Sequence, residues 1–320
     1  LHAHPEQTVR GAAIMLAYLL AGAQARLGDQ AAADRAAAHA RELGGGREPL
    51  QISERLRTAS SLRRRGWVPW AEAEYRRAAE MGPVVYKVAA LVYLSEMLHD
   101  QGRDLQAAEA RKDAVDAIHR MPAPAREQTK ETLALSHLDP AEIGARMNYF
   151  FACHWERQGD RAKQRKHLEE AIRSSPFEVD TLIALGRLPE QSEAEHKKTR
   201  KQIDRAAEML RREIQENPDE ANAYNQAAWL IGNTQGNLDE ALRFAEKAVE
   251  LEPDNSAYLD TLAHVHFAKG ELDQAIRYQS RAAEVDPHNG LIVSELKVFR
   301  DAAEKGKNAK KPSSRPGPKG

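Results

Sequence analysis

The cysteine and histidine side chains of this sequence stand at spacings that do not suit catalysis or metal binding. Cys153 and His154 are adjacent. On a helix their side chains therefore point about 100° apart, a poor arrangement for a nucleophile and its base. His264 and His266 are two residues apart, whereas two metal ligands on one helix face stand at i and i+4. We therefore interpret these residues as parts of helix faces.

Short motifs of known chemistry are missing from the sequence. It contains no CxxC pair, no GxSxG and no glycine-rich phosphate loop after a strand. The glycines at 44–46 are interpreted as a flexible linker, and His2 and His4 as a run that binds metal only adventitiously. The sequence therefore predicts a protein that is not an enzyme, with no catalytic, cofactor-binding or metal-binding residues and no cofactor.

The elements that carry these residues are amphipathic helices arranged as hairpins. Residues 255–289 hold two segments with apolar or small residues at helical spacing, the first around Leu259 and the second around Ala275. Gly270 separates the two segments, and Pro287 ends the second. A hairpin of this size is too small to bury its apolar face alone. It needs neighbours stacked on both sides.

A matching hairpin precedes this one at a spacing of about 34 residues. Corresponding positions are Gly236 and Gly270, Ala241 and Ala275, Ala248 and Ala282, and Pro253 and Pro287. This frame of small residues, a turn glycine and a final proline resembles the tetratricopeptide repeat family. The resemblance implies an all-α fold, a right-handed α-solenoid of stacked antiparallel helix pairs that forms a superhelix.

Length and composition agree with a helical array. A chain of 320 residues exceeds an ordinary single-core domain, whereas a repeat array has no such limit. The 47 basic and 48 acidic residues give a net charge of −1, so nucleic acid is not an expected partner of the chain as a whole. One cysteine excludes an internal disulfide. No run is long enough for a transmembrane segment, so we expect a soluble protein, with the cytoplasm favoured.

The repeat frame predicts two arrays and a tail. The N-terminal array, residues 1–121, contains units at about 14–47, 52–85 and 88–121. The C-terminal array, residues 145–304, contains units at 145–178, 179–219, 220–254 and 255–289 and a capping helix at 290–304. Residues 305–320 are expected to form a disordered basic tail.

Two stretches depart from the repeat period. Residues 122–144 form either an irregular helical linker between the two arrays or a degenerate repeat that packs in line. The unit at 179–219 is irregular because an insertion at about 190–199 extends a loop or the next helix.

The family resemblance also indicates where a ligand would bind. In the family, places 2, 5, 9 and 12 of the first helix of each repeat line a concave groove. Carried over to this sequence, these places nominate Arg146, Tyr149, Cys153, Glu156, Asn222, Asn225, Trp229, Asp260, His264 and Phe267. The first helix of the unit at 220–254 is expected to hold one extra residue. Its three nominated residues therefore either face the groove or are rotated partly inward, and Trp229 is alternatively a core residue.

Three functions remain open at this point. The first is a non-catalytic scaffold that binds a partner protein or peptide in the groove. The second is the docking or regulatory C-terminal part of a larger multidomain enzyme, because the chain begins at Leu1 and not at Met. The third is a nucleic-acid-associated repeat protein that uses the basic tail and the basic stretch at 196–212, although the mixed charges of that stretch favour a solvated face.

Overall fold

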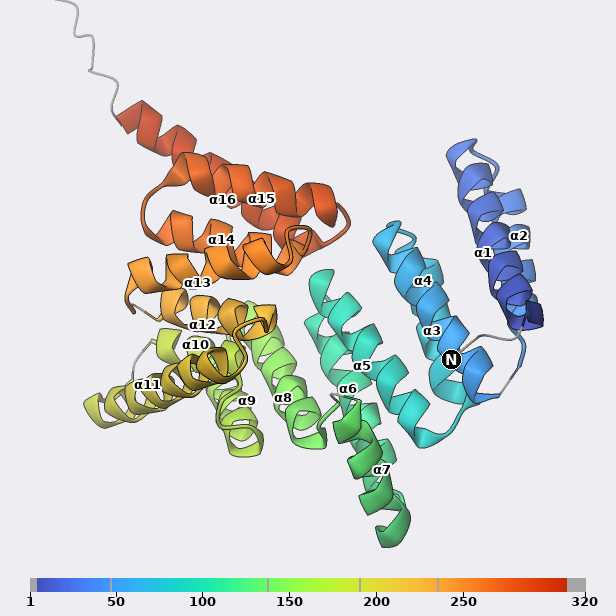
Figure 1. Ribbon diagram of the computed structural model, residues 1–320, viewed down its shortest axis with the longest axis horizontal. Helices are drawn as coiled ribbons and strands as arrows, with labels where there is room; N and C mark the ends of the chain where they lie inside the picture. The colour runs from blue at the N-terminus through green and yellow to red at the C-terminus, as the bar shows by residue number, and fades with distance from the viewer. Residues whose placement is uncertain (1–4, 47, 137, 190, 235, 310–320) are drawn as a thin grey trace, which may run out of the picture. The chain divides into compact units, whose positions relative to one another are not determined.

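The computed structural model describes residues 5–46, 48–136, 138–189, 191–234 and 236–309, and these residues form helices and no strands (Figure 1). The helices follow one another as antiparallel pairs, and neighbouring pairs stack. The expected all-α solenoid architecture is therefore confirmed. The chain divides into two compact units, residues 1–178 (unit 1) and residues 179–320 (unit 2).

Unit 1 contains α1 (Pro5–Arg26), α2 (Gln30–Leu43), α3 (Pro49–Arg64), α4 (Val68–Met81), α5 (Val84–Asp100), α6 (Asp104–His119), α7 (Ala123–Leu135), α8 (Pro140–Arg157) and α9 (Arg161–Ser174). Unit 2 contains α10 (Val179–Arg187), α11 (Glu193–Glu216), α12 (Ala221–Asn233), α13 (Leu238–Leu251), α14 (Ser256–Ala268), α15 (Leu272–Val285) and α16 (Gly290–Ala309).

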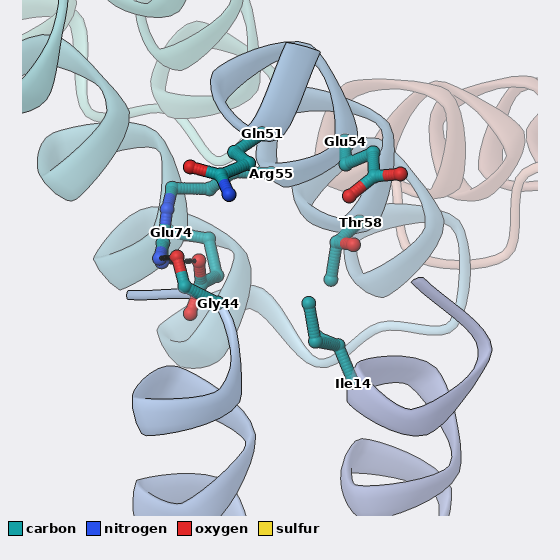
Figure 2. Close-up of a pocket in the computed structure, with 7 residues that line it drawn as sticks. All are labelled: Ile14, Gly44, Gln51, Glu54, Arg55, Thr58 and Glu74. Atoms are coloured by element: carbon teal, nitrogen blue, oxygen red, sulfur yellow. Dashed lines mark hydrogen bonds and ion pairs between the residues drawn. The ribbon is translucent and has the colours of Figure 1, made fainter. Parts of the chain in front are cut away.

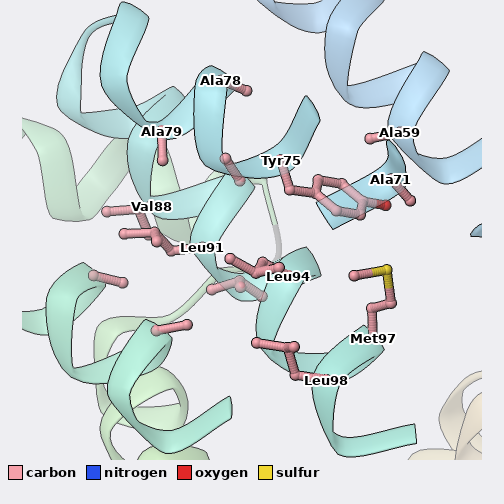
Figure 3. Packing of buried hydrophobic residues seen from close by; sticks show 14 of the residues in the cluster. Ala59, Ala71, Tyr75, Ala78, Ala79, Val88, Leu91, Leu94, Met97 and Leu98 are labelled. Atoms are coloured by element: carbon pink, nitrogen blue, oxygen red, sulfur yellow. The ribbon is translucent and has the colours of Figure 1, made fainter. Parts of the chain in front are cut away.

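Small residues allow the helices of a pair to approach closely. In unit 1, Ala59 of α3 and Ala71 of α4 are fully buried, and the ring of Tyr75 packs among them (Figure 3). Leu94 and Leu98 of α5, which belongs to the next hairpin, pack against this layer. Each hairpin thus supplies one face to its own pair and another to the following pair, which is how units that are unstable alone become stable in a stack.

The turns inside the hairpins explain the spacing of the glycines. Most are three residues long and place a glycine in the left-handed region, as Gly270 does with φ of 76°. Four residues, 234–237, separate α12 from α13, whereas α12 and α14 are both 13 residues long. The extra residue of this unit therefore lies in the turn. The expectation that it lies in the first helix was wrong, because a repeat period counts residues without assigning them to helix or turn.

Residues 122–144 do not divide the chain. Helix α7 lies here as a single extra helix, and Leu133 on its inner face is fully buried. Helix α8 packs directly on α6, and one cluster of buried apolar side chains runs from Ile14 to Phe150. The structure places the division after residue 178. Among the described residues of 122–144, it shows the helix α7 and the first residues of α8.

The insertion in the next unit lengthens a helix. Helix α10 has only nine residues, whereas α11 has 24. Ser192 begins α11 with a capping box in which Glu195 is the reciprocal partner. Buried residues from Ile203 to Ile214 hold the second half of α11 against the repeat. The first turns of α11 are the inserted residues.

The C-terminal capping helix extends beyond its predicted end. Helix α16 continues to Ala309, so residues 305–309, which were expected to be disordered, are helical. This stretch contains Lys305, Lys307 and Ala309, and lysine and alanine are good helix formers even where the apolar pattern has ended. The rest of the predicted tail, 310–320, lies outside the described residues. In the part of the chain that is described, no helix is long and apolar enough to cross a membrane.

Candidate functional site

An unbroken series of aromatic contacts lies on the inner face of unit 2. The rings of Trp229 and His264 meet edge to face at 5.1 Å, and His264 meets Phe299 in the same way at 5.1 Å. Phe267 stacks on Phe299 at 4.4 Å. Phe299 is buried, whereas the other three are half-buried. We call these four residues, from α12, α14 and α16, the aromatic row.

Hydrogen bonds fix the polar edges of the aromatic row. The indole Nε1 of Trp229 donates to Oδ1 of Asp180 at 2.7 Å, which orients the ring. The Nε2 of His264 lies 3.8 Å from Oδ2 of Asp260. Gln279 Nε2 donates to Oδ1 of the same carboxylate at 2.6 Å. Burial raises the pKa of Asp260 more than His264 and Gln279 lower it.

A hollow opens beside the aromatic row. It has a volume of about 640 Å³ and is lined by His264, Phe267 and Phe299 together with apolar Leu238 and Val298. Two small residues that also line it, Gly232 and Ala268, leave this space free of side chains. Arg187 and Glu295 contribute opposite charges to its lining. We call this space the aromatic hollow. Its size lies within the range of small-molecule and side-chain binding sites.

The structure separates the nominated residues of unit 2 by their exposure. Asn222 is exposed, and Trp229 is half-buried in the aromatic row. Asn225 is only 9% exposed, and its Oδ1 is buried without a hydrogen-bond partner. Asn225 is thus rotated partly inward, which was one of the two expected orientations. Asp260, His264 and Phe267 come together with Trp229 on one face.

The nominated residues of unit 1 lie in an ionic network. Arg146 Nε is 3.3 Å from Glu96 Oε1, and its Nη1 is 3.2 Å from Glu178 Oε1. The Arg146 guanidinium also lies 5.1 Å from the ring centres of both Tyr149 and Phe150. Arg146 and Tyr149 are therefore brought together, but each already has partners inside the unit.

Buried Arg111 completes this network from α6. It donates to Glu96 and to Ser95 Oγ, the latter at 2.9 Å. Burial raises the pKa of Glu96, but Arg146 and Arg111 lower it further, to about 2. Glu96 is therefore ionised throughout the physiological range. We call Glu96, Arg111, Arg146 and Glu178 the ionic network.

The last two nominated residues of unit 1 lie further along α8. Cys153 is half-buried, and Glu156 is exposed with its carboxylate 3.6 Å from Arg161. His154 packs edge to face on Trp155 at 4.8 Å, which agrees with the interpretation of Cys153 and His154 as parts of a helix face. Among the described residues, no group of three or more His, Cys, Asp or Glu side chains is arranged to hold a metal ion. His2 and His4 lie outside those residues.

A buried polar cluster joins the first two hairpins of unit 1. Arg55 of α3 pairs with Glu74 of α4 and donates to the carbonyl of Gly44 (Figure 2). The Tyr18 hydroxyl also donates to Glu74. The cavity beside it has a volume of about 10 Å³, enough for one water at most. Its role is to hold two hairpins together. Sequence reasoning missed the cluster, because ion pairs between residues far apart in the chain carry no periodic signal.

The basic stretch at 196–212 has acidic side chains close to Arg200, Arg211 and Arg212. Arg211 makes two hydrogen bonds to Glu240, at 2.8 and 2.9 Å. Arg200 lies 3.2 Å from Asp204, one helical turn away. The mixed charges of α11 thus form a solvated face, as the alternation of signs indicated.

Comparison with protein families gives one match. Residues 234–296, which run from the end of α12 into α16, match the model of the tetratricopeptide repeat family. This part of the chain consists of tetratricopeptide repeats. The matched repeats contain His264 and Phe267 of the aromatic row and much of the lining of the aromatic hollow.

Solved structures similar to this chain are also tetratricopeptide repeat proteins. One is a thermophilic protein of Thermus thermophilus, with 16% identity, coverage of 66% of this chain and 98% of that one, and a TM-score of 0.41. Another is from Parabacteroides merdae, with 14% identity, coverage of 90% and 99%, and a TM-score of 0.43. A third, YrrB, is described as having an unusual peptide-binding site, with 17% identity, coverage of 65% and 91%, and a TM-score of 0.29. No curated protein matches the chain.

Proposed function

We propose that the repeats of unit 2 bind a segment of a partner protein in the aromatic hollow. The observation that carries this proposal is the aromatic row, in which the half-buried rings of His264 and Phe267 and the buried ring of Phe299 line a space of about 640 Å³. A half-buried ring offers apolar area that a partner can cover. The hydrogen bond from Trp229 to Asp180 orients the indole ring that packs against His264. Preorganised aromatic surface of this kind supplies most of the affinity of many interfaces.

Helix α12, whose Gly232 and Asn233 line the hollow, carries two further asparagine side chains nearer its N-terminus. Asn222 is exposed one turn before Asn225, whose buried Oδ1 has no partner. Asn side chains both donate and accept, so they match the N–H and C=O groups of an extended segment. We infer that an apolar side chain of the partner enters the aromatic hollow while its backbone meets these amides. This is the role of a non-catalytic scaffold, the function that tetratricopeptide repeats commonly have.

The nominated residues of unit 1 are proposed as a second, weaker contact surface. Arg146 and Tyr149 are satisfied within the ionic network, so a partner would have to compete with those contacts. Cys153 and exposed Glu156 lie further along the same helix. We therefore expect substitutions at these four positions to change partner binding less than substitutions in the aromatic hollow.

The test is to block the aromatic hollow without disturbing the core. Ala268 is exposed at the last residue of α14 and lines the hollow, so Ala268→Trp fills it. A random peptide library displayed on phage is selected on the wild-type chain, and enriched peptides are measured by fluorescence anisotropy. We expect Ala268→Trp to weaken binding at least about tenfold, as loss of an interface anchor does.

The control places the same side chain on the outer helix. Gln274 is exposed on α15 and does not line the hollow, so Gln274→Trp should bind the enriched peptides as the wild type does. Equal thermal melts of the two variants show that neither has damaged the stack. Peptides that bind Ala268→Trp as tightly as the wild type would place the binding surface elsewhere.

A further inference from the structure

A second hollow lies next to the aromatic hollow in unit 2. It has a volume of about 340 Å³ and is bordered by the ends of α10 and α12 and by the first turns of α11. Arg187 and Asn233 line both spaces. The two hollows are therefore neighbours across these side chains. A ligand that fills one reaches the rim of the other.

The second hollow is basic. Arg187 and Arg200 contribute guanidinium groups and His196 an imidazole, and all three residues are exposed. No aspartate or glutamate stands among the described residues that line it. We call it the basic hollow. Its chemistry differs from that of the aromatic hollow beside it.

The guanidinium groups of the basic hollow keep donors available. Arg187 Nη2 donates to Asn233 Oδ1, which holds the side chain at the border and uses one of its five N–H donors. Arg200 pairs with Asp204 at 3.2 Å, with the two side chains 57% and 63% exposed. A pair so exposed to water is weak and is easily exchanged for another anion.

The helix ends at the basic hollow are already capped. Helix C-termini carry partial negative charge, which opposes anion binding. Here Thr234 Oγ1 donates to the carbonyl of Leu230 at 2.6 Å, at the end of α12. Gln191 Nε2 donates to the carbonyl of Leu188 at 3.1 Å, just beyond α10. These bonds reduce the partial negative charge, so the two full guanidinium charges dominate the hollow.

The basic hollow exists because of the insertion. His196, Thr199 and Arg200 lie in the first turns of α11, which are the residues that exceed the ordinary repeat length. A repeat of regular length would have no side chains at these positions. The chemistry is thus a property of this chain's irregular unit.

We propose that the basic hollow binds an anionic group of the partner segment, next to the apolar side chain held in the aromatic hollow. This inference rests on the proposed peptide-binding function and adds the chemistry of the ligand. The anionic group is a carboxylate of Asp or Glu or a phosphate on a side chain. Arg187 recognises it at the border of the two hollows, and Arg200 and His196 recognise it from α11.

Matched peptides test the inference. A phage-selected peptide whose binding requires the aromatic hollow, as shown with Ala268→Trp, is synthesised with Gln, Glu or phosphoserine at each position flanking its apolar anchor. We expect Glu or phosphoserine at one flanking position to bind about tenfold tighter than Gln, as a charge-assisted hydrogen bond allows. The tighter of the two identifies the source of the anion.

Variants assign the effect to the basic hollow. Arg187→Gln combined with Arg200→Gln should remove the preference for the anionic peptides. Arg212→Gln, at an exposed arginine of the same helix outside the hollow, should leave it unchanged.

The inference is overturned if the Gln peptide binds as tightly as the others, or if the preference survives the double variant. In either case Ala268→Trp still abolishes binding and the proposed function stands. If no selected peptide requires the aromatic hollow, the proposed function fails and this inference fails with it.

Discussion

The nominated first-helix residues have different surroundings in the two units. In unit 1, Arg146 lies between Glu96 and Glu178 and packs on Tyr149, so the first-helix side chains satisfy one another. In unit 2, the aromatic row does not fill the space beside it, and a hollow of about 640 Å³ remains. A stack of helical hairpins therefore does not present a hollow by its fold alone. A hollow needs helix positions that the protein's own side chains leave unfilled.

The difference arises from the types of side chain at these positions. Opposite charges on neighbouring helices attract one another and close the space between them. Aromatic rings in edge contact are rigid. They leave a space between themselves and small residues such as Gly232 and Ala268. The ionic network joins charged side chains within unit 1, whereas the aromatic row of unit 2 leaves part of its apolar ring surface exposed.

The largest expected effect comes from breaking the ionic network. Arg111 is buried, and Arg111→Met removes one of the two arginines beside Glu96, whose side chain is 32% exposed. We expect a loss of about 2 kcal/mol in the free energy of unfolding, measured by urea denaturation, because the variant removes hydrogen bonds made by a buried charged group. The double variant Arg111→Met/Glu96→Gln should recover part of this loss.

A matched substitution in unit 2 provides the control. Arg211 makes two hydrogen bonds to Glu240 but is 36% exposed. Arg211→Met should therefore cost no more than about 1 kcal/mol. Equal losses in the two variants would show that the ionic network contributes no more than an ordinary surface pair.

Acid should affect the two units in opposite directions. The pKa of Glu96 falls from 4.5 to about 2 on folding. Its contribution to the stability of unit 1 is therefore complete above about pH 4.5 and is lost as the pH falls toward 2. The pKa of Asp260 is raised by burial. Its protonation therefore favours the folded state of unit 2 as the pH falls from neutral, until the unfolded chain is also protonated near its ordinary value of 3.8.

Hydrogen exchange measured between about pH 7 and about pH 3 resolves these contributions unit by unit. Comparison with Glu96→Gln and Asp260→Asn isolates them, because neither variant can titrate at the substituted position. A fall in the stability of unit 1 that Glu96→Gln does not reduce would remove the ionic network as its cause.

The smallest effects concern two helical glycines. A methyl group on Gly144 of α8 would meet only the Ser174 hydroxyl, at 3.9 Å, so Gly144→Ala should stabilise unit 1 by about 0.5–1 kcal/mol in thermal melts. A methyl group on Gly232 would lie 3.1 Å from Val265 and at the wall of the aromatic hollow. Gly232→Ala should give less stabilisation and should weaken binding of the selected peptides. Identical gains with unchanged binding would show that Gly232 does not keep the hollow open.

Much of the repeat architecture follows from the sequence. Turn glycines such as Gly270 and stop residues such as Pro287 mark hairpins that the structure contains, because backbone conformation restricts which residues stand there. The family frame also selected Trp229, His264 and Phe267, which the structure brings together with buried Phe299. Their use by a partner remains a proposal.

Other features depend on spatial relations that a period does not record. The frame located an extra residue between 220 and 254 but assigned it to a helix, when it lies in the turn after Asn233. The Arg55–Glu74 pair joins helices through charges that stand outside any periodic pattern. The aromatic hollow depends on missing side chains at Gly232 and Ala268, and small residues in a repeat equally signal close helix packing. The basic hollow depends on an insertion, and the sequence did not decide whether it lengthens a loop or the next helix.

Helix α7 shows that position along the chain and position in the stack are separate properties. Helix α8 packs directly on α6. The complete helix α7 is therefore added between consecutive hairpins, and the cluster of buried apolar side chains continues past it. At such a place, an assignment of repeats from the sequence period alone misses a repeat or adds one that does not exist. When the sequence is aligned to a repeat structure or redesigned, the repeats should therefore be numbered by which helices are in contact. The segment between α6 and α8 should be treated as an addition beside the stack that can vary.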